Sequence, residues 1–324
     1  MLTTRQRLIT TVAAAVLTAT LTACAGSGGA SAPEAGAGSL AGDVDLTGVT
    51  INVGSKDYPE QRLIAQIQIA ALRAAGATVN DLSGLGGTQV ARTALETGQI
   101  DLYTEYTGTA WQNIFRQDLP PNDPDELYGR IQELDAGNGI TWTGRAPLNN
   151  TFALAGIADV MDAHNIRTIS DYARLASTAP EDATLCASAE FSTRDDGLPG
   201  IENTYAFALP AADIVDQESA ISVVTMRDQQ QCNFTKADAT DPRVDENGLR
   251  FLIDDRHFFP VYNPAITMKT GFYQDHSAQF DSVFGAIGDA LTQDEILRLN
   301  KAVQVGGAPA ESVAVQFLRD NNII

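Results

Sequence analysis

Between residues 101 and 111 the sequence reads DLYTEYTGTAW, so that tyrosines, a carboxylate and threonines surround Gly108. A strand that serves only for packing would favour Val and Ile at such positions. Aromatic faces attract cations, whereas hydroxyl groups and the backbone N–H groups that open a helix bind anions. The stretch therefore combines residue types that could contact a ligand at a strand end that runs into a helix, and we expect Glu105 to have a structural role.

The elements around this stretch predict an α/β fold. The 324 residues are enough for one large or two medium domains. Alternation and helical periodicity predict strands at 49–56, 77–85 and 100–106, with helices at 59–76 and 86–99 between them. Gly76 and Gly98 are expected to end these two helices. This order favours parallel strand pairing and ligand chemistry at the strand ends.

Other familiar catalytic and cofactor motifs are absent from the sequence. GLGGT at 84–88 lacks the lysine and the spacing of a phosphate-binding loop, so it predicts a tight turn before a helix. His164, His257 and His276 match no metal-site spacing, and no G-x-S-x-G elbow occurs. We therefore expect no metal, no cofactor and no enzymatic activity.

The N-terminus predicts export. Two arginines precede an apolar run at 8–21 that is short for a membrane span, which is typical of a signal peptide and assigns residues 1–23 to it. The following LTAC resembles a bacterial lipobox, in which Cys24 is lipidated and becomes the first residue of the mature chain. An ordinary secretory signal with a chance cysteine is the alternative.

A linker follows the signal peptide. Residues 24–45 are rich in Gly, Ala and Ser and lack the apolar residues needed for a core, which predicts a flexible tether. Lipid attached to Cys24 would hold the mature protein on the outer face of the bacterial cell membrane, outside the cytoplasm.

The net charge limits the classes of binding partner, and the cysteine count predicts a disulfide. Removal of Arg5 and Arg7 with the signal peptide changes the net charge from −20 to −22, and no basic stripe occurs, so nucleic acid is not an expected partner. With Cys24 lipidated, Cys186 and Cys232 remain as an even pair in an oxidising compartment, which predicts a disulfide. Two buried free thiols are the alternative.

Several stretches occur together in the order found in one family. These are VGSKDYPEQ, GLGGTQVARTALETGQIDLYTEYTGTA, NNTFALA, EFSTRDDGLPG, PVYNPAI and a C-terminal LNKAV. The chain from about residue 46 onward resembles the extracytoplasmic substrate-binding proteins of ABC importers for glycine betaine, choline, carnitine and related osmoprotectants, the ProX type.

The resemblance implies a two-lobed periplasmic-binding-protein fold of type II, with the ligand between the lobes and two hinge crossings. The implied first lobe is 46–148 plus 263–324, and the second is 149–262. It also implies a monomer that binds a small cationic or zwitterionic ligand, closes around it and docks on ABC permease subunits.

The resemblance also implies a ligand site. An aromatic cage suits a trimethylammonium group, which has no N–H to donate and is attracted by ring faces. A betaine needs in addition a carboxylate subsite of cations and hydroxyl groups. Position by position, the family's cage falls on Tyr106, Phe152, Phe234 and Tyr262, its carboxylate subsite on Lys56, Thr109 and Arg194, and a supporting amide on Asn150.

Phe152 and Phe234 stand where the family has tyrosine. A phenyl ring keeps the cation–π attraction of about 0.5–2 kcal/mol but lacks the hydroxyl. The two cations of the carboxylate subsite favour glycine betaine over choline. The alternatives are the same fold with choline, carnitine or a less polar aromatic ligand and, more distantly, an exported hydrolase using Asp195 or Asp196 with His257.

Overall fold

The computed structural model describes residues 44–117, 120–121 and 123–324. The predicted signal peptide 1–23, the lipidation site Cys24 and all but the last two residues of the tether 24–45 lie outside the described residues. In the part of the chain that is described, no helix combines the length and the apolar character needed to cross a membrane.

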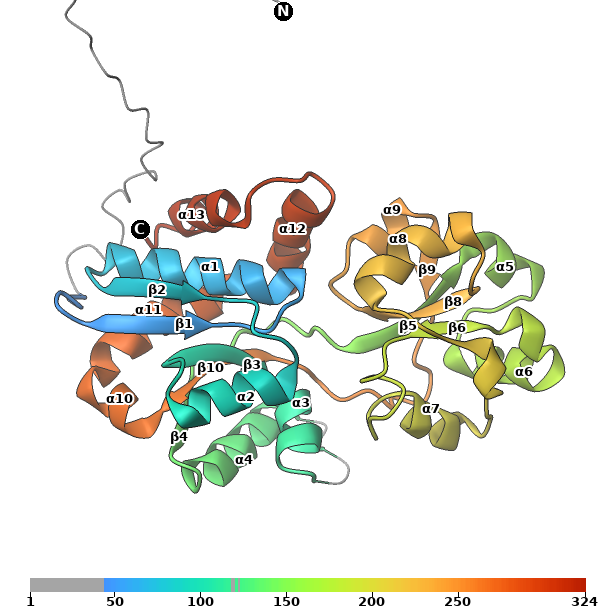
Figure 1. Cartoon of the computed structure of the whole chain (residues 1–324), viewed down its shortest axis with the longest axis horizontal. Coiled ribbons are helices and arrows are strands. Elements are labelled where there is room, and N and C mark those ends of the chain that lie inside the picture. Colours follow the sequence, from blue (N-terminus) through green and yellow to red (C-terminus); the bar gives the residue numbers. More distant parts are fainter. Residues whose placement is uncertain (1–43, 118–119, 122) are drawn as a thin grey trace, which may run out of the picture. The chain divides into compact units, whose positions relative to one another are not determined.

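The first sheet is mixed, with the order β2-β1-β3-β10-β4 (Figure 1). β1, β2 and β3 pair in parallel as the sequence predicts, because helices connect them. β10 comes from the far end of the chain and inserts antiparallel between β3 and β4. The strands are β1 (Thr50–Gly54), β2 (Thr78–Leu82), β3 (Leu102–Tyr106), β4 (Ile140–Thr143) and β10 (Pro264–Lys269).

Helices cover both faces of this sheet. One core lies between the sheet and α1, α11, α12 and α13, and a second lies on the side of α2 and α4 (Figure 1). The helices are α1 (Pro59–Ala74), α2 (Thr88–Thr97), α3 (Thr107–Thr109), a π-helical turn (Ala110–Ile114), α4 (Pro124–Ala136), α10 (Thr270–Asp275), α11 (Ser277–Ala290), α12 (Gln293–Gln304) and α13 (Ala310–Asp320).

Local signals set the ends of these helices. Gly98 ends α2 in the left-handed conformation (φ +76°), as predicted from its place after the helical pattern. Thr292 caps α12 by accepting a hydrogen bond from the backbone N–H of Glu295.

The second sheet has the order β7-β6-β8-β5-β9. β5 pairs antiparallel with β8 and β9, whereas β6 pairs in parallel with β7 and β8. Its elements are β5 (Phe152–Ile157), α5 (Ala158–Ala163), α6 (Ile169–Thr178), β6 (Leu185–Ala187), α7 (Leu198–Tyr205), β7 (Ile214–Asp216), α8 (Ser219–Gln229), β8 (Phe234–Asp238), α9 (Arg243–Glu246) and β9 (Leu249–Phe251), with 3₁₀ turns at Pro180–Asp182 and Ala211–Asp213.

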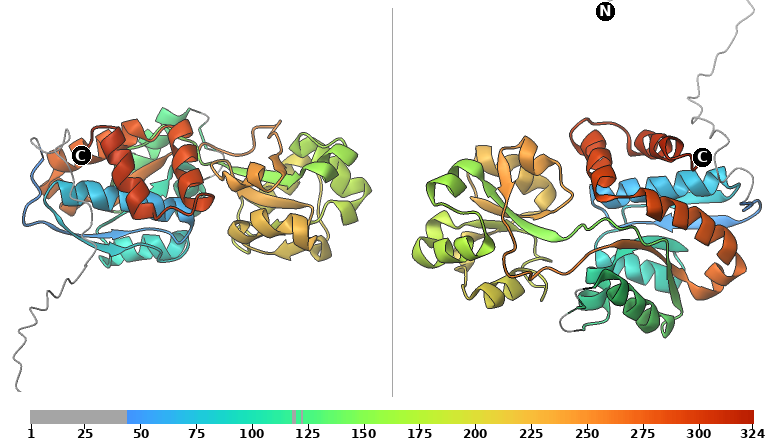
Figure 2. Two further views of the ribbon diagram at one scale, coloured as in Figure 1. Left: turned by 90° about the horizontal axis from the view of Figure 1, so that it is seen from above. Right: turned by 180° about the vertical axis from the view of Figure 1, so that it is seen from behind.

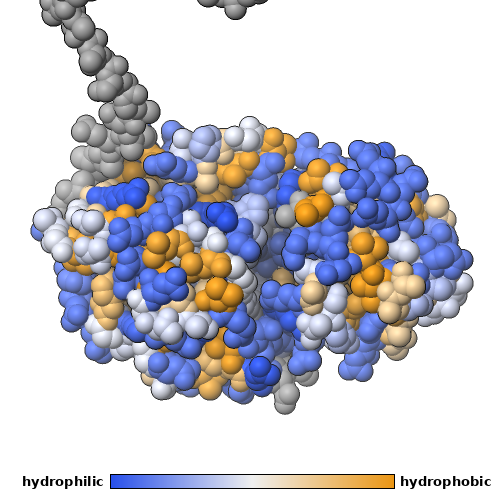
Figure 3. Space-filling model, in the orientation of Figure 1, coloured by the Kyte–Doolittle hydropathy of each residue, from blue (hydrophilic) through white to orange (hydrophobic). Residues whose placement is uncertain are grey.

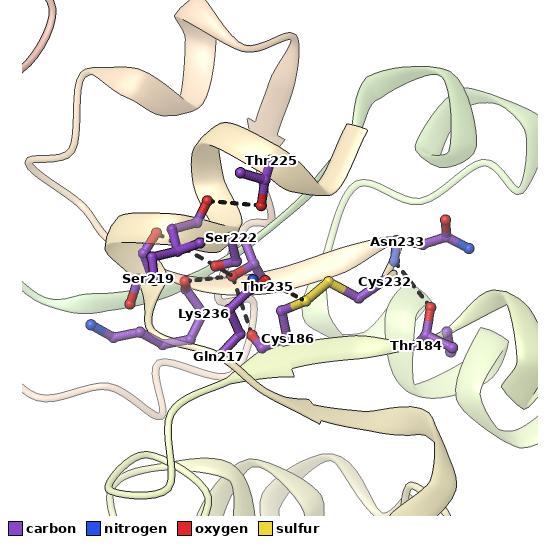
Figure 4. Close-up of a disulfide and its surroundings, with 12 residues drawn as sticks. Thr184, Cys186, Gln217, Ser219, Ser222, Thr225, Cys232, Asn233, Thr235 and Lys236 are labelled. Atoms are coloured by element: carbon purple, nitrogen blue, oxygen red, sulfur yellow. Dashed lines mark hydrogen bonds between the residues drawn. A yellow bond between two sulfur atoms is a disulfide. The ribbon is translucent and has the colours of Figure 1, made fainter. Parts of the chain in front are cut away.

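The predicted disulfide is present in this second part. Cys186 in β6 and Cys232, two residues before β8, are joined across a Cα–Cα distance of 5.7 Å (Figure 4). The bond lies in a core that also contains Val223 and Met226 of α8. It ties the inner strand β6 to the segment that leads into β8.

The chain passes between the two sheets twice, after β4 and again after β9, and the two crossing segments are visible in Figure 2. They are hydrogen-bonded to each other through Ala146 N to Pro264 O and Asn150 N to Tyr262 O. We propose the lobe boundaries expected from the sequence, 46–148 plus 263–324 and 149–262. Each described sheet draws its strands from one of these two sets.

Candidate functional site

A cleft of about 520 Å³ is lined by residues from both sets of elements, and Figure 3 shows the surface hollowed between them. The residues expected from the sequence come from the loop between β1 and α1, the end of β3, α3, both crossing segments, the start of β5 and the loop after β6. Those that line the cleft are Lys56, Tyr106, Thr109, Asn150, Phe152, Arg194 and Tyr262.

Phe234 lies elsewhere. Its side chain is fully buried, its ring centroid is 4.7 Å from that of Tyr172, and a Cβ at Gly156 would meet it at 2.6 Å. Phe234 begins β8, whereas Lys236, Asp238 and Thr240 farther along line the cleft. Phe234 is therefore a core residue and does not line the cleft, in contrast to the expectation that it belongs to the cage. We leave it out of the site.

Tyr106 ends β3 at the point where the chain turns into α3. All five residues of β3 are buried, which fixes the direction in which Tyr106 points. Its hydroxyl donates to Glu60 Oε1 at 2.6 Å. Burial raises the pKa of this hydroxyl well above its ordinary value, so it stays a donor, and its ring forms part of the cleft wall.

Gly108 allows the Tyr262 ring to approach α3. A Cβ at Gly108 would lie 2.7 Å from the ring, so any side chain there would displace Tyr262. The ring is fully buried, and its hydroxyl donates to Asp196 Oδ2 at 2.7 Å. The close approach of the Tyr262 ring therefore requires a glycine at position 108.

Gly108→Ala is expected to weaken ligand binding about tenfold, because the displaced Tyr262 ring loses its place in the cleft wall and its bond to Asp196. Isothermal titration calorimetry measures the change. Gly129→Ala in α4 is the matched control, because a Cβ there meets no atom within 4 Å. Equal affinities of the two variants would contradict this role of Gly108.

Glu60 is a functional candidate that the sequence did not single out. It is 3% exposed and lines the cleft from the first turn of α1. Oε1 accepts from Tyr106 and from Asn150 Nδ2 at 2.7 Å. Oε2 accepts from the Thr240 hydroxyl and from Asn300 Nδ2 at 2.7 Å.

All four of these donors are neutral. Loss of water around the carboxylate raises the pKa of Glu60, and the hydrogen bonds from Thr240, Tyr106 and Asn300 lower it. Burial dominates, so the negative charge of Glu60 is only partly compensated within the described structure. In the sequence Glu60 is indistinguishable from an acidic residue that favours a helix N-terminus.

The two predicted cations of the carboxylate subsite already have acidic partners. Lys56 Nζ lies 2.5 Å from Glu105 Oε1, and both side chains are almost fully buried. Arg194 binds Asp196 through Nε at 2.7 Å and also through Nη2, and it binds Glu190 through Nη1 at 2.8 Å. The sequence predicted a structural role for Glu105, and the structure identifies Lys56 as its partner.

Phe152 is surrounded by rings and cations. Its centroid lies 5.2 Å from that of Tyr262 and 5.6 Å from that of Phe191. Arg194 Cζ lies 4.9 Å and Lys236 Nζ 4.4 Å from the same centroid. Side chains of this protein therefore already make the cation–π contacts that this ring offers.

The charges on the cleft wall are unequal. Four cationic side chains face six anionic ones, so the wall as a whole favours a ligand with a positive group over a simple anion. The cations are Lys56, Arg194, Lys236 and Arg243, and the anions are Asp57, Glu60, Glu190, Glu218, Asp238 and Asp241.

Asp196 and His257, two of the groups considered for hydrolysis, lie in different surroundings. Asp196 is fully buried and is engaged by Arg194 and Tyr262, whereas His257 is exposed. Among the described residues there is no group of three or more His, Cys, Asp or Glu that would hold a metal ion.

Comparisons with known proteins identify relatives of this chain. The glycine-betaine-binding protein of Pseudomonas aeruginosa is 30% identical over 280 residues, which cover 85% of this chain and 89% of that protein. The glycine betaine-binding protein YehZ of Escherichia coli is 32% identical, over 83% of this chain and 90% of YehZ. The ergothioneine transport permease/binding protein EgtU of Helicobacter pylori is 27% identical, over 82% of this chain and 46% of EgtU.

The solved structure of apo YehZ matches with a TM-score of 0.61 at 28% identity, over 85% of this chain and 99% of that one. The two-lobed binding-protein fold expected from the sequence is thereby confirmed. A family model described as the substrate-binding domain of the ABC-type glycine betaine transport system matches residues 49–320. The chain therefore belongs to this family of ABC-transporter substrate-binding proteins.

Proposed function

We propose that this protein binds a small zwitterion with a quaternary ammonium group, glycine betaine or a close relative, and delivers it to the permease of an ABC importer. The observation that carries the proposal is Glu60, a buried carboxylate on the cleft wall whose four hydrogen-bond donors are all neutral. A buried charge of this kind is stabilised by a counter-charge. A cationic ligand would supply it.

The surroundings of Glu60 suit a methylated cation. Tyr58 and Tyr106 line the cleft beside it, and the influence of Glu60 raises the pKa of both tyrosines after the larger effect of burial. A trimethylammonium group needs no hydrogen-bond acceptor and gains from ring faces and a nearby negative charge. This end of the cleft would therefore hold the cation.

Arg194 and Thr109 suit the other end of a zwitterion. Arg194 interacts with Asp196, Glu190 and the Tyr262 hydroxyl, and its guanidinium also lines the cleft, where it would meet a ligand carboxylate. Thr109 lies at the end of α3 and lines the same cleft. Closure of the cleft about the two crossing segments would bring the residues at both ends of the cleft into contact with the ligand and exclude water.

Choline is the second candidate ligand. It lacks a carboxylate, and the excess of acidic groups on the cleft wall favours a ligand with net positive charge. Isothermal titration calorimetry of the mature protein with glycine betaine, choline and carnitine separates the candidates. Failure of all three to bind at millimolar concentration would overturn the proposal.

Tyr106→Ala is expected to weaken the binding of glycine betaine at least tenfold, because it removes a ring face beside Glu60. Tyr106→Phe is the control that keeps the face and removes only the hydroxyl, so we expect a smaller loss. Calorimetry on both variants measures this. Equal losses in Tyr106→Phe and Tyr106→Ala would show that the ring face contributes nothing.

The compartment is part of the proposal. We propose that residues 1–23 are removed, that Cys24 is lipidated and that the protein works as a monomer on the outer face of the cell membrane. Mass spectrometry of the N-terminal peptide from the native host tests this. An unmodified Cys24 would contradict the anchor while leaving the ligand proposal intact.

A further inference from the structure

Lys236 occupies a place where the sequence led us to expect an aromatic ring. Side chains alternate along β8, so Phe234, Lys236 and Asp238 share one face of the second sheet. Phe234 lies in the core, and Lys236 is the first residue of this face to line the cleft. An ammonium therefore stands beside Phe152, where a complete aromatic cage would have another ring.

The Lys236 ammonium is positioned from two sides. Its Nζ donates to Asp238 Oδ1, and it lies 4.4 Å from the Phe152 centroid. Asp238 is opposite Phe152 in the β5–β8 pairing, so both contacts come from the same sheet. Of the three N–H groups of the ammonium, one is used by Asp238.

Arg194 brings a second cation to the same ring, from the loop between β6 and α7. The negative face of Phe152 and the carboxylates of Asp196, Glu190 and Asp238 allow the two cations to lie close together. A trimethylammonium group at Phe152 would meet both of them and be repelled. A carboxylate there would be attracted by both.

We propose that Lys236 is a specificity-determining residue that forms, with Arg194 above Phe152, a subsite for the carboxylate of the ligand. The inference rests on the proposed function, and it assigns Phe152 to the anionic end of the ligand instead of the cation cage. Tyr58, Tyr106 and Glu60 then hold the ammonium end. The cleft selects zwitterions over plain cations because Lys236 and Arg194 place two N–H donor groups against the Phe152 ring, where only the carboxylate end of a ligand can accept from them.

Glycine betaine and choline form the matched pair for the test, because they share the trimethylammonium group and differ in the carboxylate. Lys236→Met keeps the apolar stem and removes the charge. We expect this variant to bind glycine betaine at least tenfold more weakly, whereas its affinity for choline should change less than threefold. Lys236→Arg should restore the preference for glycine betaine. Lys269→Met, at the far end of β10, is the control and should change neither affinity.

Calorimetry gives both affinities, and circular dichroism checks that each variant is folded. Equal weakening of the two ligands by Lys236→Met would show a general structural role and overturn the inference. Unchanged affinity for glycine betaine would overturn it as well.

A second measurement separates this inference from the proposed function. If the unsubstituted protein binds neither glycine betaine nor choline, the proposed function fails, and acetate becomes the probe of the anion subsite. We then expect acetate to shift the NMR signals of the Lys236 side chain in the unsubstituted protein and to shift them much less in Arg194→Met. Absence of a shift in the unsubstituted protein would overturn the subsite.

Discussion

Glu60→Gln is expected to weaken the binding of glycine betaine by on the order of 100-fold, because it removes the buried charge that faces the ligand cation. Glutamine keeps the size of the side chain and one acceptor for the hydroxyl of Tyr106 and the amide of Asn150. Calorimetry on the purified variant measures the loss. The same loss is expected with choline, since both ligands carry the trimethylammonium group.

Glu133→Gln provides the matched control for this substitution. Glu133 is exposed on α4 and lies outside the cleft. The affinity of the Glu133→Gln variant for glycine betaine should therefore equal that of the unsubstituted protein. A Glu60→Gln variant that binds as tightly as Glu133→Gln would show that Glu60 does not neutralise the ligand.

The pH dependence of binding follows from the same residue. Burial raises the pKa of Glu60, and only the ionised carboxylate attracts a cation. Affinity should therefore fall as the pH is lowered through this raised pKa, at a higher pH than for an ordinary carboxyl group. Titrations across mildly acidic pH test this, and Glu60→Gln should lack this part of the pH dependence.

The stability of the ligand-free protein should change in the opposite direction. A carboxyl group whose pKa is higher in the folded than in the unfolded state releases its proton more readily on unfolding, so the free energy of unfolding falls as the pH rises through that interval. At neutral pH Glu60→Gln removes this cost. Glutamine has only one oxygen, so the lost acceptor for Thr240 and Asn300 offsets part of this gain. Urea unfolding should show a folded ligand-free variant whose free energy of unfolding depends less on pH than that of the parent, so weaker binding would not reflect misfolding.

Loss of the Cys186–Cys232 disulfide is expected to lower the free energy of unfolding by about 2–4 kcal/mol, because the bond closes a loop across a sequence separation of 46. The double variant Cys186→Ser, Cys232→Ser tests this by urea unfolding, with the unsubstituted protein in reducing buffer as the control. Both cysteines are buried, so some of the loss will come from packing of the serine hydroxyls.

Because neither cysteine lines the cleft, the affinity for ligand at low temperature should change little. A double variant with unaltered stability would show that the disulfide does not constrain the unfolded chain. A large loss of affinity in a folded double variant would connect it to the site.

The sequence determined the local structure of this protein. The alternation of 49–56, the periodicity of 59–76 and the glycine after α2 predicted elements that the structure contains. These signals are local, since side-chain periodicity and a left-handed cap depend on neighbouring residues. The antiparallel insertion of β10 beside β3 was not predicted, because it joins strands separated by about 160 residues.

The motif DLYTEYTGTAW and the family stretches also identified most of the cleft wall, since those residues lie at the ends of predictable elements. Only the tertiary structure decided which side chains face each other there. Glu60 depends on hydrogen-bond donors from β3, a crossing segment and α12. The position of β8 against β5 decides that Lys236 lines the cleft and that Phe234 does not. Burial and charge pairing arise from contacts between distant segments, so sequence spacing alone does not determine them.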